Sequence, residues 1–230
     1  MAVLYKTPHF RLMGDRAVLV ELGDAINPDI NRKVRQLFLM LEGKGVPGIK
    51  DLVPSYRSLM VVYDPLELTL PNLQDTVADV WKHADVSGVP RPKMLEVPVL
   101  YGGKYGPDLE WVASYHHLSP EEVIRFHTLP TYQVYMIGFT PGYPYLGEVP
   151  EPISTPRRQT PRTSVPQGSV AIAQRQTGIY PVQSPGGWHI LGWTPVKLFD
   201  ASKQPPSLLE MGDLVRFISI QEEEIPEWKG

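Results

Sequence analysis

Proline dominates the second half of this sequence. Of the 25 prolines in 230 residues, 12 lie between Pro141 and Pro206. Proline lacks a backbone N–H and clashes with the preceding helical turn, so this window is incompatible with helices. Short apolar runs between glycine and proline turns instead predict short β-strands in a closed barrel or a sandwich. The expected strands are residues 132–137, 169–173, 179–182, 189–191, 196–199 and 214–220.

The first ninety residues have a different pattern, in which strands alternate with helices. Asn27-Pro28 combines an N-cap residue with proline at the first helical position, and apolar residues from Ile30 to Leu41 recur at helical spacing. Strands are expected at 17–22, 49–53 and 58–63, with a second helix around 73–81. This order predicts a ferredoxin-like α/β domain whose last strand is either residues 94–100 or lost to the next domain.

The two patterns predict an α+β protein of two domains, residues 1–92 and 93–230. Residues 86–92 form a plausible linker because proline and glycine interrupt both periods. Two helices are expected before the β-rich region, at 108–117 and from a capping box at Ser119 to about Thr128.

Composition excludes several classes of function. The sequence has no cysteine, a net charge of −3 and a pI near 6.1, which argue against disulfides, thiolate metal sites and nucleic-acid binding. No apolar run is long enough to cross a membrane, so we expect a soluble, cytoplasmic protein with no nucleic-acid or membrane partner. Phosphate-binding loops, G-x-S-x-G elbows and metal-binding histidine pairs are also missing. A self-contained nucleotidase or metalloenzyme is therefore not expected.

A dense set of strings carries a family resemblance. The strings are GFTPGYPYLG (138–147), TPRRQTPRTSVPQGSV (155–170), QTGIYP (176–181) and SPGGWHILGWTP (184–195), with YGGKYGPDL (101–109) and VPSYRSL (53–59) upstream. Together they resemble the KipI family, whose members are also called allophanate hydrolase subunit 1 or the B subunit of 5-oxoprolinase. The likeness covers nearly the whole chain in order.

The resemblance implies a small α/β N-terminal domain, a cyclophilin-like β-barrel C-terminal domain, and partner subunits. Family members act with the KipA-type C subunit of 5-oxoprolinase and with its LamB/YcsF-type A subunit. Together these hydrolyse 5-oxo-L-proline to L-glutamate at the expense of ATP. The chain is thus expected to be inactive alone, with ATP shared between subunits, Mg accompanying the ATP, and no metal site of its own. Alternatives within the same fold are an inhibitor of a sporulation histidine kinase and a part of a urea carboxylase or allophanate hydrolase system.

Two arginines are candidates for binding phosphate or a substrate carboxylate. Arg157 and Arg162 lie in a proline-rich segment, and guanidinium groups form bidentate contacts with such anions. The alternative is that they pair with Asp or Glu side chains of the barrel.

A groove is expected near the second glycine-rich string. Gln176, Tyr180 and Trp188 could line it, with Gly186 and Gly187 allowing close approach to a ligand. The alternative for the two aromatic residues is core packing.

His189 is the candidate acid or base. It alternates with Trp188 along a strand, so only one of the two can easily face the groove. His127, late in a capped helix, is expected to interact with the helix dipole rather than to act in catalysis.

Three further aromatic residues are candidates for a partner interface. Phe139, Tyr143 and Tyr145 lie between prolines on a rigid loop, which favours contact with another protein. The alternative is that they plug the barrel by packing on its core.

Overall fold

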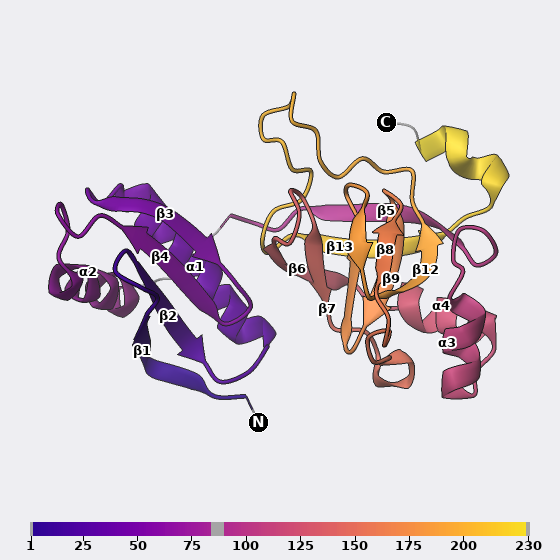
Figure 1. Cartoon of the computed structure of the whole chain (residues 1–230), viewed down its shortest axis with the longest axis horizontal. Helices are drawn as coiled ribbons and strands as arrows, with labels where there is room; N and C mark the ends of the chain where they lie inside the picture. Colours follow the sequence, from indigo (N-terminus) through magenta and orange to yellow (C-terminus); the bar gives the residue numbers. More distant parts are fainter. Residues whose placement is uncertain (1, 84–89, 229–230) are drawn as a thin grey trace. The chain divides into compact units, whose positions relative to one another are not determined.

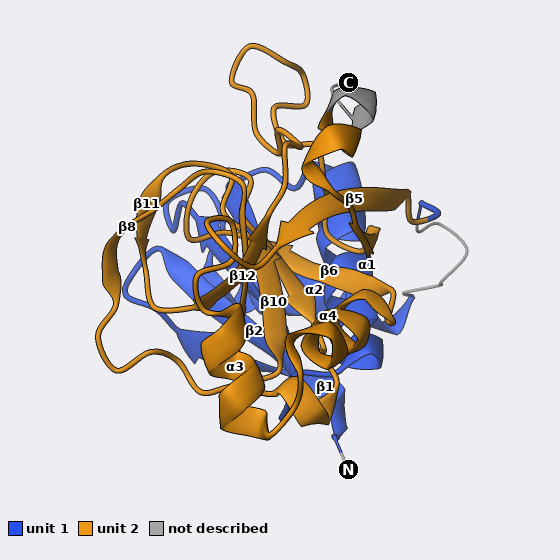
Figure 2. Cartoon of the chain, turned by 90° about the vertical axis from the view of Figure 1, so that its right-hand side faces the viewer, with its two compact units in different colours: residues 1–91 blue, residues 92–230 orange. Residues whose placement is uncertain are grey.

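The computed structural model describes residues 2–83 and 90–228, and it divides into two compact units, residues 1–91 and 92–230 (Figure 2). Most of the predicted linker, residues 86–89, lies outside the described residues. Among the described residues, no helix has both the length and the apolar character needed to cross a membrane.

The N-terminal unit is an antiparallel sheet packed against two helices (Figure 1). The sheet has the order β1–β2–β4–β3. Its elements are β1 (Leu4–Leu12), β2 (Ala17–Gly23), α1 (Pro28–Lys44), β3 (Ile49–Pro54), β4 (Ser58–Tyr63) and α2 (Leu70–Lys82).

Local sequence signals fix both ends of α1, and its start at Asn27 and Pro28 is the one expected. The Asn27 side chain accepts hydrogen bonds from the backbone N–H groups of Asp29 and Ile30, and Pro28 follows the cap. Gly45 ends the helix in the left-handed region, where a residue without Cβ is favoured.

The edge strand of this sheet differs from the prediction. The order β2–α1–β3–β4–α2 matches the predicted pattern, but the position beside β2 is filled by β1 from the chain's N-terminus. Residues 94–101 form β5 and belong to the C-terminal unit instead. The strand Leu4–Leu12 was not predicted, because its residues are mostly exposed and its apolar ones do not alternate with polar ones.

The C-terminal unit is a closed β-barrel, which confirms the predicted α+β class with a barrel in the second half. The barrel order is β10–β7–β6–β13–β5–β12–β9, and β8 and β11 form a separate pair. The strands are β5 (Met94–Tyr101), β6 (Tyr132–Ile137), β7 (Pro144–Gly147), β8 (Arg162–Val165), β9 (Ser169–Ala173), β10 (Gln176–Ile179), β11 (Ser184–Gly186), β12 (His189–Trp193) and β13 (Leu214–Ser219). The helical elements are α3 (Leu109–His116), α4 (Pro120–Thr128), η2 (Glu151–Ile153) and η3 (Glu222–Trp228).

The first and last strands of this unit pair with each other in the barrel wall. β13 runs parallel to β5, with Phe217 opposite Val97. These residues are buried in one apolar core with Val134, Ile172 and Leu191. Closing the barrel through its first and last strands buries both and removes a sheet edge.

The shortest strands are the ones that sequence patterns miss. β7, β8 and β11 are each three or four residues long and contain or adjoin proline or glycine. The predicted strand 179–182 is shifted to Gln176–Ile179, and the predicted strand 196–199 contributes only an isolated bridge between Phe199 and Ser207.

Candidate functional site

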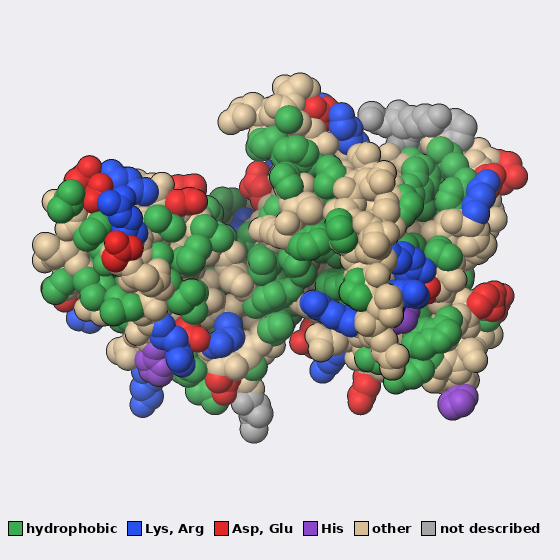
Figure 3. All heavy atoms as spheres, in the orientation of Figure 1, with side chains coloured by type: hydrophobic (Ala, Val, Ile, Leu, Met, Phe, Trp, Pro, Cys, Tyr) green, Lys and Arg blue, Asp and Glu red, His purple; other side chains and the backbone are tan. Residues whose placement is uncertain are grey.

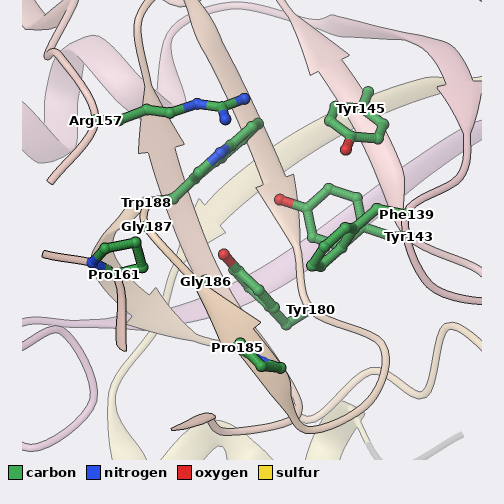
Figure 4. Close-up of a pocket in the computed structure, with 10 residues that line it drawn as sticks. All are labelled: Phe139, Tyr143, Tyr145, Arg157, Pro161, Tyr180, Pro185, Gly186, Gly187 and Trp188. Atoms are coloured by element: carbon green, nitrogen blue, oxygen red, sulfur yellow. The ribbon is translucent and has the colours of Figure 1, made fainter. Parts of the chain in front are cut away.

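An aromatic pocket of about 280 Å³ opens on the C-terminal unit (Figure 4). It lies between the loop that leads into β7, the loop before β8 and the turn between β11 and β12. Its lining residues are Phe139, Tyr143, Tyr145, Arg157, Pro161, Tyr180, Pro185, Gly186, Gly187 and Trp188. We call this the aromatic pocket.

The rings of the aromatic pocket pack mainly edge to face. Tyr143 meets Tyr180 at a centroid distance of 5.2 Å and 87°, and Trp188 at 5.9 Å and 88°. Tyr143 and Tyr180 are each 2% exposed and Trp188 is 6% exposed. The rings are therefore both barrel packing and pocket wall, so the two alternatives from the sequence coincide.

Two glycines make this packing possible. A Cβ atom on Gly186 would lie 2.2 Å from the Tyr180 hydroxyl, and one on Gly178 would lie 2.7 Å from the Tyr143 hydroxyl. Any larger residue at these positions would push the phenols out of place. The hydroxyl groups of Tyr143, Tyr145 and Tyr180 point toward the space beside Trp188 (Figure 4).

The phenols of Tyr145 and Tyr180 remain protonated at neutral pH. Burial raises the pKa of Tyr180, and the nearby Arg157 charge offsets this only in part. Burial likewise raises the pKa of Tyr145. Both groups can therefore donate hydrogen bonds to a carbonyl or carboxylate oxygen.

Phe139 forms the exposed rim of the pocket. Its side chain is 61% exposed and its backbone lies in the left-handed region, at φ 67°. Its ring meets Tyr143 edge to face at 5.6 Å. Left-handed backbone is unfavourable for a residue with a Cβ, so the turn holds an apolar ring in water at a conformational cost.

Arg157 is the cation of the aromatic pocket. It is exposed and makes no ion pair within the described part of the chain. The adjacent backbone is anchored, since the N–H of Arg158 donates to the carbonyl of Gly187 at 2.9 Å. In Figure 4 the Arg157 side chain runs beside the indole of Trp188. A guanidinium held in this way is available to a ligand anion.

Arg162 has a different environment. Its two terminal nitrogens donate to the two oxygens of Asp108 at 2.9 and 2.8 Å, and Arg158 donates to the same carboxylate at 3.0 Å. The backbone N–H of Ile190 is a fourth donor, at 2.7 Å. Burial alone would raise the pKa of Asp108, but these hydrogen bonds and the arginine charges bring it below its usual value. The predicted ligand-binding role of Arg162 is therefore replaced by a buried ion pair.

Asp108 was not predicted as a site residue. It stands at the N-cap of α3, where an aspartate normally binds the helix N–H groups, yet its side chain makes no capping hydrogen bond. The only sequence signal was its position after Pro107 in the family-like string 101–109. Its arginine partners are 50 and 54 residues away.

His189 lies outside the aromatic pocket, on the opposite face of the chain from Trp188. Its ring stacks on Trp111 at 4.5 Å and 2°, and its Nε2 is 3.0 Å from the carbonyl of Pro156. Burial lowers its pKa, so the ring is neutral at pH 7. The predicted alternation with Trp188 thus places Trp188, not His189, in the pocket.

Gln176 also falls outside the lining of the aromatic pocket. It begins β10 opposite Gly147, and its side-chain nitrogen is buried without a partner among the described residues. The predicted interface residues Phe139, Tyr143 and Tyr145, by contrast, all line the pocket together with Tyr180, Gly186, Gly187 and Trp188.

His127 lies in the last turn of α4, but its side chain is buried against the barrel and is not exposed to solvent. Its Nδ1 is 2.6 Å from the Tyr101 hydroxyl and its Nε2 is 2.8 Å from the Thr177 hydroxyl, which itself donates to the carbonyl of Ala171. Burial lowers the pKa of His127 to about 3. A neutral imidazole cannot act as the cationic dipole partner that the sequence suggested, so that prediction was wrong.

No metal centre is visible in the part of the chain that the structure describes, because no three His, Asp or Glu side chains gather there. The aromatic pocket presents a guanidinium, phenol hydroxyls and apolar walls.

The fold and the order of these strings define a class of protein. The family model described as "Carboxyltransferase domain, subdomain C and D" matches residues 8–209. The structure titled TTHA0988 aligns with a TM-score of 0.78 and 39% identity over 90% of this chain, which spans about 40% of that longer chain.

Two curated relatives are closer to this chain in length, and both are B subunits of 5-oxoprolinase. The relative from Bacillus subtilis is 39% identical, over 94% of this chain and 95% of the relative. The one from Haemophilus influenzae is 46% identical, over 69% and 74% respectively. The urea amidolyase of Lachancea kluyveri is more distant, at 24% identity over 94% of this chain and 13% of the relative. The chain belongs to the family of 5-oxoprolinase B subunits, also called the KipI family.

Proposed function

We propose that this chain is the B subunit of an ATP-dependent 5-oxoprolinase and that its aromatic pocket receives 5-oxo-L-proline. The observation that carries the proposal is Arg157, a guanidinium without a protein carboxylate among the described residues, which lines a pocket of aromatic walls. The relatives named as B subunits of 5-oxoprolinase support the same function, and they are more similar to this chain than the urea amidolyases are.

The dimensions and chemistry of the pocket suit a small cyclic amide. Its volume of about 280 Å³ lies just below the roughly 300–1,000 Å³ of ligand pockets, as suits a small ligand. The flat lactam ring can pack against the indole of Trp188, while its carboxylate meets Arg157. The protonated phenols of Tyr145 and Tyr180 can donate to the lactam carbonyl or the carboxylate.

The reaction explains why such a pocket would serve within a complex. A lactam resists water because its amide is resonance-stabilised, and phosphorylation of the carbonyl oxygen by ATP makes the carbon electrophilic. One water then opens the ring at the C–N bond to give a γ-glutamyl phosphate, and a second water releases inorganic phosphate and glutamate. These steps need phosphoryl-group stabilisation beyond one guanidinium and two phenols, which is the contribution expected of KipA-type and LamB/YcsF-type partner subunits and of Mg bound with ATP.

The test is reconstitution with the two partner subunits. We expect the complex to convert 5-oxo-L-proline and ATP to glutamate, ADP and phosphate. We expect no such release by the chain alone, and none when urea replaces 5-oxo-L-proline. Arg157→Gln should lower kcat/KM for 5-oxo-L-proline about 100-fold, because a charge-assisted contact is lost. Arg125→Gln removes another exposed arginine outside the pocket and should leave kcat/KM unchanged.

Two results would overturn the proposal. One is a complex that forms but gives no ATP-dependent glutamate. The other is full turnover with Arg157→Gln, which would show that the pocket cation does not meet the substrate.

A further inference from the structure

A second cavity, of about 770 Å³, is lined in part by the loop of residues 156–160. The residues of its lining that matter here are Asp108, Trp111, Tyr115, Arg157, Arg158 and His189. Arg157 lines both cavities. The two cavities are therefore neighbours that share one guanidinium.

An aromatic stack forms one wall of the second cavity. Trp111 and Tyr115 are four residues apart on α3, so they share a face, and their rings stack at 5.1 Å and 19°. The stack continues from Trp111 onto His189. Trp111 is 48% exposed and Tyr115 is 50% exposed, which leaves ring surface on which a further planar group can stack.

The lining of the second cavity is positively charged. Arg157 and Arg158 line it together with the single carboxylate of Asp108, which gives the lining a net charge of +1. Arg162, outside the lining, pairs with the same carboxylate as Arg158. Arg158 contacts Asp108 through one terminal nitrogen, and Arg157 makes no ion pair in the described part of the chain. On the face drawn in Figure 3, Lys and Arg side chains of the C-terminal unit lie beside apolar surface.

Two buried polar atoms of the lining residues have no partner among the described residues: Nε of Arg158 and Nδ1 of His189. His189 is 3% exposed. Its Nε2 faces a carbonyl, which only accepts, so Nε2 carries the proton and Nδ1 is an acceptor. Arg158 Nε is a donor. A ligand that satisfies both must present oxygen acceptors and a hydroxyl or bound water that donates.

We propose that the second cavity binds the nucleoside triphosphate, with the base on the Trp111–Tyr115 stack and the phosphates at Arg158 and Arg157. An aromatic base, anionic oxygens and ribose hydroxyls are the three features that the cavity provides for. The shared Arg157 then lies between the phosphate chain and the ligand of the aromatic pocket, where it can balance negative charge on a transferring phosphoryl group. This assignment rests on the proposed function, since it supplies the ATP of that reaction.

The test compares ligands on the full-length chain and then on the reconstituted complex. Equilibrium dialysis of the chain should show binding of ATP and ADP, weaker binding of tripolyphosphate, and weaker binding still of adenosine. Tyr115→Ala removes an exposed ring and should weaken ATP binding about tenfold while leaving tripolyphosphate unchanged. Arg157→Gln should weaken both ATP and tripolyphosphate, and Arg125→Gln neither.

A crossed design in the complex separates the two cavities. Tyr115→Ala should raise the KM for ATP and leave that for 5-oxo-L-proline unchanged, and Phe139→Ala, at the rim of the aromatic pocket, should do the reverse. If neither the chain nor the complex binds ATP, or if Tyr115→Ala leaves ATP affinity and KM unchanged, the nucleotide assignment is wrong even where glutamate release succeeds. A complex without glutamate release counts against the proposed function, and dialysis of the chain still decides the nucleotide site.

Discussion

Arg157 and Arg162 lie five positions apart in one proline-rich segment, yet the fold gives them opposite environments. Arg162 donates to both oxygens of Asp108, a residue only 5% exposed, while Arg157 is exposed at the aromatic pocket without a carboxylate partner among the described residues. A buried, paired charge holds elements together, because removing either partner leaves the other desolvated. An unpaired charge beside a cavity is free to meet a ligand. The same residue type thus forms an ion pair at one position, and at the other it lines the cavity for which we propose a recognition role.

The same contrast exists at the start of β12. Trp188 lines the aromatic pocket, whereas the ring of His189 stacks on Trp111 in the second cavity. Successive side chains of an extended chain point to opposite faces, so one dipeptide supplies walls to two cavities.

The largest effect on stability is expected from Asp108→Ala. The change leaves two arginines and the Ile190 N–H without their acceptor, and we expect a loss of about 3 kcal/mol in the free energy of unfolding, moderated by partial exposure of the arginines. Urea denaturation measures it. Arg162→Ala on the Asp108→Ala background should cost much less than on the wild type. If the losses for Asp108→Ala and Arg162→Ala simply add in the double variant, the two side chains are not coupled. The contrast between a paired Arg162 and an unpaired Arg157 would then fail.

The next effect is a pH dependence of the free energy of unfolding, caused by His127, which is buried in the barrel and not in the aromatic pocket. The pKa of His127 is about 3 in the folded chain against 6.5 in the unfolded chain, so the unfolded state binds more protons between these values and stability falls as pH falls through that range. From pH 7 to pH 5 we expect a loss of about 2 kcal/mol from this residue. His189 contributes in the same direction, because its pKa is also lowered.

Urea midpoints at the two pH values check this expectation. His127→Gln should reduce the pH dependence between pH 5 and 7, and the exposed His117→Gln is the matched control. If His127→Gln leaves the change in stability between pH 5 and pH 7 unaltered, the buried imidazole is protonated in the folded chain.

A smaller effect concerns the strained rim of the pocket. Phe139→Gly and Phe139→Ala both remove the exposed ring, but only glycine relieves the backbone at φ 67°. The glycine variant should be more stable than the alanine variant by about 1 kcal/mol, as measured by thermal or urea unfolding. If alanine is the more stable of the two, the turn does not hold a left-handed residue in solution.

The smallest effect sharpens the comparison of the two arginines. Arg157→Gln should change the free energy of unfolding by no more than about 0.5 kcal/mol, because an exposed side chain without an ion pair in the described chain is removed. Urea unfolding alongside Arg162→Ala gives the contrast directly. A loss for Arg157→Gln as large as that for Arg162→Ala would assign Arg157 a structural role.

Sequence patterns singled out many residues that line the aromatic pocket, although Phe139, Tyr143 and Tyr145 were predicted as a partner interface rather than as pocket walls. Every candidate from the GFTPGYPYLG string and the GGW turn lines it, because proline and glycine fix short loops locally. The same reasoning misplaced Gln176 and His189, whose facing depends on strand register, and it missed Asp108, which resembles an ordinary helix cap. It also missed β1, an edge strand with little apolar alternation.

The sequence by itself determined the features that depend on neighbours along the chain. Backbone chemistry within a few residues accounts for the N-cap of α1 at Asn27 and for the capping box at Ser119. It also accounts for the exclusion of α-helices by the prolines. Only the tertiary structure decided which arginine is paired, because Asp108 and Arg162 are separated by 54 residues and meet only in the folded C-terminal unit. Pairing over such distances depends on the whole packed fold, and no local pattern encodes it.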